Sequence, residues 1–117
     1  MLIWIMSVFV SNIVIEQGFD FTTTFELEST TSNRPIDLSN YTIDSQIRKT
    51  YSSSTSQSFT TSAIDPVNGK VTISMGSTVT STLKSGRYVY DIKLTNSDGL
   101  VTKAIEGSAL VRSGVTR

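Results

Sequence analysis

Apolar and polar residues alternate along several segments of the chain, and this alternation is its clearest structural signal. Residues 19–28 read FDFTTTFELE, with aromatic, threonine and leucine side chains at every second position. An α-helix would spread these side chains around its circumference, whereas a strand places them on one face. The segment therefore predicts a half-buried β-strand. Its core-facing residues are expected to be Phe19, Phe21, Thr23, Phe25 and Leu27.

The same pattern predicts further strands over residues 11–17, 41–49, 59–64, 70–75, 86–95 and 100–112. Their core-facing residues are expected to be Ile13, Ile15, Tyr41, Ile43, Ser45, Ile47, Val71, Ile73, Met75, Tyr88, Tyr90, Ile92 and Leu94. Gly107 falls inside the last of these segments and suggests a β-bulge there.

Turn-forming residues separate the predicted strands. Residues 29–35 have turn composition, residues 65–69 end in an Asn-Gly pair suited to positive φ, and residues 96–99 predict a tight hairpin. Residues 77–83 predict either one helical turn capped by Ser77 or a connection that crosses between sheets. Residues 50–58 carry too little apolar surface for a core and predict a long surface loop.

About seven or eight short strands without a convincing long helix indicate an all-β protein. The expected architecture is an immunoglobulin-like Greek-key β-sandwich over residues 11–117. In such folds a tyrosine near the start of a late strand anchors the preceding corner through its hydroxyl, and Tyr88 fits this role. The alternative, in which Tyr88 and Tyr90 form a ligand-stacking pair, is less favoured because both residues share the apolar face of their strand.

Residues 1–10 read MLIWIMSVFV, with Ser7 as the only polar side chain. The run is too short for a membrane span and lacks the cationic residues of a secretory signal. It is either an apolar N-terminal arm that packs on a partner subunit or a start-site artefact with Met6 as the true start. The candidate partner-binding residues of the arm are Ile3, Trp4, Ile5, Val8, Phe9 and Val10.

Composition and charge exclude several classes of function. The chain has no Cys and no His, so thiolate metal sites, the commonest general base and the commonest metal ligand are absent. Ten basic and ten acidic side chains cancel, which argues against a nucleic-acid binder. The acids are scattered, so neither an enzyme nor a cofactor is expected. A calcium site through Asp65, Asn68 and Asp98 is a weaker alternative to turn chemistry at those positions.

The serine-rich segment 50–58 offers a second candidate site. Tyr51 and Phe59 flank this segment, and exposed aromatic rings are the usual stacking platforms of a glycan site. The possible ligand loop therefore comprises these two aromatic residues and the hydroxyl-rich residues between them. A plain mobile loop is the favoured interpretation.

Several short motifs together carry a family resemblance. They are NIVIEQG at 12–18, FTTTF at 21–25, IDLSNY at 36–41, QIR at 46–48, NGKVTI at 68–73, LKSGRYVYDI at 83–92 and EG at 106–107. Over residues 12–117 the chain resembles small virion proteins of tailed bacteriophages, particularly T4-like phages of cyanobacteria. It is also similar to the N-terminal domain of phage baseplate upper proteins.

The resemblance implies an immunoglobulin-like domain that attaches to the tail, neck, baseplate or capsid and has no catalytic motif. Expected partners are other virion proteins and copies of the chain itself in a symmetric assembly, without nucleic acid or a membrane span. The protein would be made in the host cytoplasm and reside in the virion. The alternative function is a host-surface glycan-binding adhesion module displayed on the virion.

Overall fold

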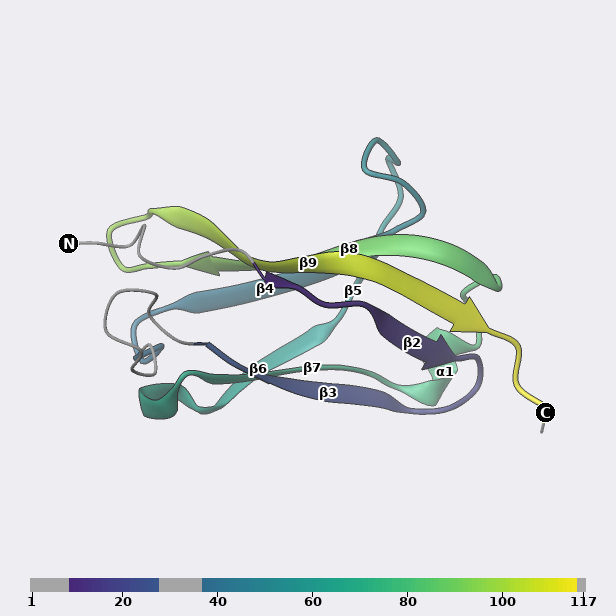
Figure 1. Cartoon of the computed structure of the whole chain (residues 1–117), viewed down its shortest axis with the longest axis horizontal. Helices are drawn as coiled ribbons and strands as arrows, with labels where there is room; N and C mark the ends of the chain where they lie inside the picture. Colours follow the sequence, from purple (N-terminus) through teal and green to yellow (C-terminus); the bar gives the residue numbers. More distant parts are fainter. Residues whose placement is uncertain (1–8, 28–36, 116–117) are drawn as a thin grey trace.

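The computed structural model describes residues 9–27 and 37–115, which form two layers of β-structure (Figure 1). The larger sheet holds β1 (Phe9–Val10), β2 (Ile13–Glu16), β4 (Thr42–Arg48), β5 (Gln57–Ser58), β8 (Gly86–Thr95) and β9 (Val101–Arg112). The smaller sheet holds β3 (Phe21–Glu26), β6 (Thr60–Asp65) and β7 (Lys70–Met75). Two short helical turns, η2 (Pro66–Asn68) and α1 (Ser77–Thr80), connect strands. The expected all-β class is confirmed for the described part of the chain.

The strand order places the N-terminal segment beside the last strand. In the larger sheet the strands lie in the order β1-β9-β8-β4-β5, and β2 also pairs with β9. The smaller sheet has the order β3-β7-β6. Strands β4, β8 and β9 are antiparallel neighbours, whereas β1 and β2 run parallel to β9. The N-terminal segment is thus an edge strand of the larger sheet.

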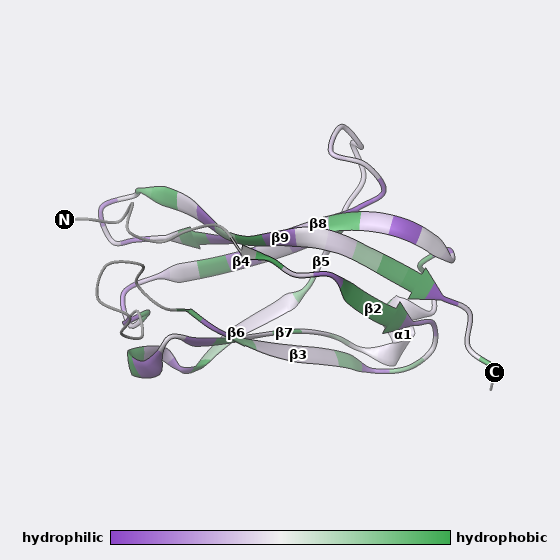
Figure 2. Ribbon diagram, viewed as in Figure 1, coloured by the Kyte–Doolittle hydropathy of each residue, from purple (hydrophilic) through white to green (hydrophobic). Residues whose placement is uncertain are grey.

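Side chains from both sheets fill the space between the two layers. Ile92 and Leu94 of β8, and Val71 and Ile73 of β7, are completely buried. Figure 2 shows hydrophobic and polar residues interspersed along the strands, as expected of sheets with one buried face. Of the residues expected in the core, Ile13, Ile15, Leu27, Ser45, Ile47, Val71, Ile73, Met75, Tyr90, Ile92 and Leu94 are buried, while Phe21, Thr23, Phe25, Tyr41, Ile43 and Tyr88 are partly buried.

Phe19 is the exception, because its side chain is 47% exposed. Its backbone N–H donates to the carbonyl of Glu16 at 3.2 Å, which closes a turn between β2 and β3. Strand β3 begins only at Phe21. The expectation that Phe19 faces the core is therefore wrong, because the turn sets the direction of its side chain.

Gly107 does not form the predicted bulge. The register shifts between the pairs Ile92↔Ile105 and Lys93↔Lys103, so the extra residue is Ala104, while Gly107 pairs regularly with Tyr90. A Cβ atom on Gly107 would lie 2.1 Å from the backbone oxygen of Ser11. The glycine is needed because the N-terminal segment, which runs beside β9, approaches it there at a distance that no side chain allows.

Hydrogen bonds anchor the N-terminal segment at this close approach. The Tyr90 hydroxyl donates to the carbonyl of Ser11 at 2.6 Å, and the N–H of Ser11 donates to the carbonyl of Glu106 at 2.9 Å. The N–H of Ser108 donates to Asn12 Oδ1 at 3.0 Å. Burial raises the pKa of the Tyr90 phenol, which keeps it a donor at neutral pH. The anchored segment includes β1, which pairs with Ile105 and Glu106 of β9.

The segment 77–83 begins with the predicted helical turn, α1, and also crosses from β7 in one sheet to β8 in the other. The N-cap residue is Gly76 rather than Ser77, so the predicted cap is wrong. The N–H of Ser77 instead donates to Asp20 Oδ1 at 2.7 Å. Thr80 Oγ1 donates to the carbonyl of Phe19 at 2.9 Å, so α1 holds the turn between β2 and β3.

The predicted turns at 65–69 and 96–99 are confirmed. Gly69 ends η2 with φ of +69°, as the Asn-Gly pair predicts. In the hairpin between β8 and β9, Asn96 Oδ1 accepts hydrogen bonds from the backbone N–H groups of Asp98 and Leu100, each at 2.9 Å. The loop 49–56 is mostly exposed, as expected, and is followed by β5, which adds to β4.

Tyr88 anchors the bend before β8 through its hydroxyl. This hydroxyl donates to the carbonyl of Lys84 at 2.7 Å, and the ring packs against the core. The acceptor lies one residue after the segment 77–83, which crosses between the sheets. The anchoring role expected for Tyr88 is therefore supported by its contacts.

Replacing Gly107 by Ala tests the close approach of the N-terminal segment. The new methyl group would overlap the Ser11 carbonyl, so we expect the free energy of unfolding to fall by about 1–3 kcal/mol, the usual cost of overpacking. Gly76→Ala is the matched control, since a Cβ at Gly76 meets nothing within 4 Å. Urea denaturation of both variants measures the difference. Equal stability of the two would contradict this role for Gly107.

Candidate functional site

An open groove of about 440 Å³ lies on the outer face of the larger sheet, next to the loop 49–56. In Figure 1 this loop projects away from the sheet between β4 and β5. The groove is lined by Asp44, Gln46 and Arg48 of β4, by Asp91 and Lys93 of β8, and by Tyr51 of the loop. These residues occupy the outward positions of their strands.

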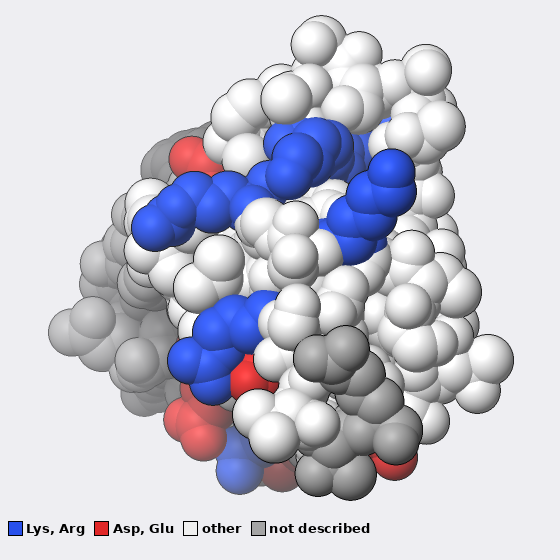
Figure 3. Space-filling view, turned by 90° about the vertical axis from the view of Figure 1, so that its right-hand side faces the viewer, with Lys and Arg blue, Asp and Glu red and all other residues white. Residues whose placement is uncertain are grey.

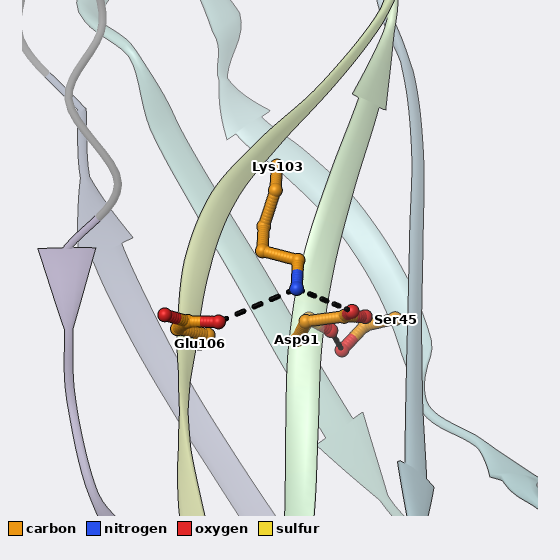
Figure 4. Close-up of polar contacts among 4 residues, drawn as sticks. All are labelled: Ser45, Asp91, Lys103 and Glu106. Carbon is orange, nitrogen blue, oxygen red and sulfur yellow. Dashed lines mark hydrogen bonds and ion pairs between the residues drawn. The ribbon is translucent and has the colours of Figure 1, made fainter. Parts of the chain in front are cut away.

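Beside this groove, Lys103 lies between two carboxylates (Figure 4). Its Nζ is 3.3 Å from Glu106 Oε1 and 3.6 Å from Asp91 Oδ2. Asp91 and Glu106 stand directly opposite each other in the β8–β9 ladder, where like charges repel. The ammonium of Lys103 offsets this repulsion.

The electrostatic surroundings raise the pKa of Lys103 above its ordinary value of 10.5. Burial by itself lowers this pKa, but the hydrogen bond to Glu106 and the negative charges of Asp91 and Glu106 together raise it by more. Below Asp91, Ser45 Oγ donates to the Asp91 backbone carbonyl at 2.6 Å and fixes β4 against β8. The cluster is therefore a fixed ion-pair network at neutral pH.

Arg48 fixes the base of the neighbouring loop. Its Nη1 donates to the carbonyl of Ser53 at 2.7 Å, and its Nη2 donates to Gln46 Oε1 at 3.0 Å. Thr50 and Ser53 close the turn, because the N–H of Thr50 donates to Ser53 Oγ at 3.0 Å. The groove thus presents charged and amide groups held by neighbours, and its chemistry is hydrogen bonding and ion pairing to a polar ligand.

Only one of the two aromatic residues predicted to flank a ligand loop is exposed. Tyr51 is 72% exposed and lines the groove. Phe59 is 5% exposed, and its ring centroid lies 5.9 Å from that of Phe21 and 6.2 Å from that of Tyr90. Phe59 begins the crossing to the smaller sheet and packs in the core, so its expected role as a stacking platform is wrong.

The candidate partner-binding residues are only partly described. Ile3, Trp4, Ile5 and Val8 lie outside the described residues. Phe9 and Val10 form β1, which pairs with Ile105 and Glu106 of the same chain. Val10 remains 73% exposed in this position.

No group of His, Cys, Asp and Glu that could hold a metal ion occurs among residues 9–27 and 37–115. Asp65 Oδ2 accepts a hydrogen bond from Asn68 Nδ2 at 2.9 Å within the η2 turn, while Asp98 lies in the β8–β9 hairpin. Asp65 and Asn68 therefore lie in one turn and Asp98 lies in another, as expected of residues that form turns. Among the described residues, no helix is both long and apolar enough to cross a membrane.

The ion-pair cluster was not predicted as a site. The alternation does place Asp91 and Lys93 on the outward face of their strand, and the hairpin at 96–99 implies that β9 returns beside it. The pairing of Asp91 with Glu106 depends on the bulge at Ala104, however, and no residue signals this bulge. The sequence therefore indicates the face but not the cluster.

In the comparisons with known proteins, this chain is similar only to solved structures. No family model matches the chain, and no curated protein matches it. A point mutant of the SrpA adhesin from Streptococcus sanguinis is similar, with a TM-score of 0.52, 13% identity, and coverage of 92% of this chain and 56% of that chain. An internalin-like protein from Listeria monocytogenes has a TM-score of 0.44 at 13% identity, with coverage of 92% and 28%. The chain therefore spans little more than half of the first and less than a third of the second, and the likeness concerns the fold alone.

Replacing Glu106 by Gln tests the ion-pair cluster. Loss of the charged partner should lower the pKa of Lys103 toward its ordinary value, with the fold unchanged. In the wild type the raised pKa stabilises the fold below about pH 10.5, and this contribution is lost as the pH rises through the folded-state pKa. Nuclear magnetic resonance titration of the Lys103 side chain measures the shift. An unchanged pKa in Glu106→Gln would contradict the arrangement.

Proposed function

We propose that the chain is a non-enzymatic domain that acts by docking to other proteins. The proposed setting is the virion of a tailed phage, at the tail, neck, baseplate or capsid, because the sequence resembles proteins found there. Its partners would be other virion proteins and further copies of this chain. The absence of His and Cys from the whole sequence supports a non-catalytic role, since these residues supply many of the nucleophiles and general bases of enzymes.

An immunoglobulin-like Greek-key sandwich is the fold we infer within the all-β class. Strands β4, β8 and β9 are neighbours in one sheet, and β3, β7 and β6 are neighbours in the other, as expected for strands C, F, G and B, E, D of that fold. The hydroxyl of Tyr88 bonds to the bend before β8, as a tyrosine corner would. The similarity to the streptococcal adhesin structure is consistent with the coarser description as a β-sandwich.

One observation carries the docking proposal: the N-terminal edge of the larger sheet is open and apolar. Within residues 9–27 and 37–115, β1 and β2 pair with β9 on one side and with no second strand on the other. Val10 is 73% exposed and Val14 is 48% exposed on these strands. An unpaired edge with exposed apolar side chains is a template for strand addition by another chain.

The sequence N-terminal to β1 is also apolar. Ile3, Trp4, Ile5 and Val8 all lie within the eight residues before β1 in the sequence. Burial of large apolar side chains is the main source of free energy in protein association. We therefore assign the main docking contact to residues 1–14, with the apolar segment and the exposed valines acting together.

Deleting residues 1–8 tests this assignment. The deletion leaves every described strand in place, so we expect a folded protein that no longer associates with copies of itself. Sedimentation velocity in about 0.5 M salt measures the association, because charge contacts are largely screened there. The double variant Val10→Ser with Val14→Ser should weaken association in the same way.

The matched control for the edge variant is Val67→Ser with Val101→Ser. These valines are 61% and 55% exposed, but they do not lie on β1 or β2. The control should associate like the wild type. Association that survives both the deletion and the edge substitutions would contradict the docking proposal.

A glycan-binding adhesion module is the second candidate function, and the exposed ring of Tyr51 beside the polar groove favours it. If the groove binds glycans, an array should give reproducible hits that Tyr51→Ala abolishes, because the ring supplies the stacking surface. Phe19→Ala is the control, since Phe19 is also exposed but does not line the groove. An array without hits for the wild type would rule this candidate out.

A further inference from the structure

The charges of the protein are sorted along its long axis, although they cancel overall. The described structure measures 48 × 29 × 21 Å. Figure 3 shows Lys and Arg side chains gathered at one end, the right-hand end of Figure 1. The net charge of zero therefore hides a local excess of positive charge at this end.

The basic end carries Lys49, Lys84 and Arg87, all exposed and all without a carboxylate ion-pair partner among the described residues. Arg112 lies at the same end but is neutralised, because its Nη2 is 2.7 Å from Glu16 Oε1. The hydrogen bond and charge of Arg112 lower the pKa of Glu16, so the pair stays ionised at neutral pH. Asp20 lies beside α1 at this end and offsets one of the three free positive charges, so two remain unbalanced.

Tyr88 organises the basic end into a concave surface. The Nζ atom of Lys49 lies 4.7 Å from the centroid of the Tyr88 ring, and the Tyr88 hydroxyl holds the backbone of Lys84. A groove of about 510 Å³ opens between them, lined also by Leu83 and Gln57. The groove therefore combines two ammonium groups with an aromatic ring and an aliphatic side chain.

The acidic end carries Asp37, Asp65 and Asp98, none of which has a Lys or Arg ion-pair partner in the described part of the chain. The N–H of Leu38 donates to the carbonyl of Pro66 at 2.7 Å, which brings the first two aspartates to the same end. Asp98 lies at the exposed tip of the β8–β9 hairpin. Lys70 is also at this end, but it pairs with Glu26 at 3.8 Å.

We propose that copies of this chain dock end to end, with the β8–β9 hairpin tip of one copy in the basic groove of the next. Asp98 would meet the ammonium groups of Lys49 and Lys84. Leu100, 49% exposed beside the tip, would pack against the Tyr88 ring. The inference rests on the proposed self-assembly and adds to it a second, charge-based contact. Because the two ends differ, the contact is heterologous and repeats from copy to copy, which generates rings or filaments.

A second copy fits the basic groove better than a nucleic acid does. The groove is lined by two lysines and by Arg48, which is held by Ser53 and Gln46, and it lies on a protein whose charges balance, whereas nucleic-acid sites neutralise many phosphates with many cations. The complementary acidic surface is present on the same chain with its carboxylates free of ion pairs. Complementary charge also orients the docking and speeds it, as end-to-end assembly requires.

Charge reversal at each end, followed by mixing, tests the proposal. The wild type should associate in about 0.01 M salt, and the charge-based part of this association should vanish near 0.5 M salt. Lys49→Glu with Lys84→Glu gives a protein with two acidic ends, and Ser97→Lys with Asp98→Lys gives one with two basic ends. Each variant alone should associate about tenfold or more weakly, because like charges then face each other. An equimolar mixture should recover association, since opposite charges meet again.

The control Thr24→Glu with Ser62→Glu adds negative charge on exposed positions in the middle of strands of the smaller sheet, away from the two ends, and should behave like the wild type. Circular dichroism checks that every variant is folded. Variants that associate like the wild type, or a mixture that stays monomeric, would overturn the proposal. A different set of results would also overturn the proposal. In it, the wild type does not self-associate in low salt but binds a DNA duplex, and Lys49→Glu with Lys84→Glu abolishes that binding.

Failure of this inference is distinguishable from failure of edge docking. Suppose that association in high salt depends on residues 1–14, and that the charge variants behave like the wild type. The proposed function would then stand, and the end-to-end contact would be ruled out. Recovery of association on mixing, with no effect of the edge substitutions, would support the end-to-end contact alone.

Discussion

The contact of Tyr90 and Gly107 with Ser11 determines the arrangement on which the rest of the structure depends. The Tyr90 ring packs edge-on against Phe59 in the core, while its hydroxyl reaches the Ser11 carbonyl. Gly107 lies directly opposite Tyr90 and leaves room for that carbonyl. The N-terminal segment is thereby fixed as the parallel edge strand on β9. An open apolar edge follows directly from this geometry.

The same two sheets also separate the charges on which the proposed self-assembly depends. Strands that run along the long axis bring their terminal residues and turns to two opposite ends. Turns rich in Asp and Asn occupy one end, while Lys49, Lys84 and Arg87 flank the turns at the other. The charge balance of the sequence is consistent with a surface that packs against neighbours. The balance conceals, however, that acidic and basic side chains lie at opposite ends. In the proposed assembly, the open edge and the charged ends supply two different contacts for one small domain.

Much of the fold could be predicted from alternation, because a half-buried strand directly constrains every second residue. Core positions such as Ile73, Ile92 and Leu94 were recovered in this way. The failures occur where local patterns compete with tertiary contacts. Gly107 resembles a bulge residue in the sequence, but a glycine is needed there because the backbone of Ser11, 96 residues away in the sequence, lies too close for a side chain. Phe59 resembles the end of a loop, but it is drawn into the core where the chain changes sheets.

The candidate sites were harder to predict than the fold, because they depend on registers between strands and on which ends of strands coincide. The ion-pair cluster around Lys103 needs an unsignalled bulge at Ala104, and the basic groove needs Tyr88 to join two turns. Small-angle X-ray scattering of the full chain in low salt tests the central claim of assembly by docking most directly. The account predicts that the largest dimension grows well beyond 48 Å as the protein concentration rises. A particle whose largest dimension stays constant over the whole concentration range would contradict it.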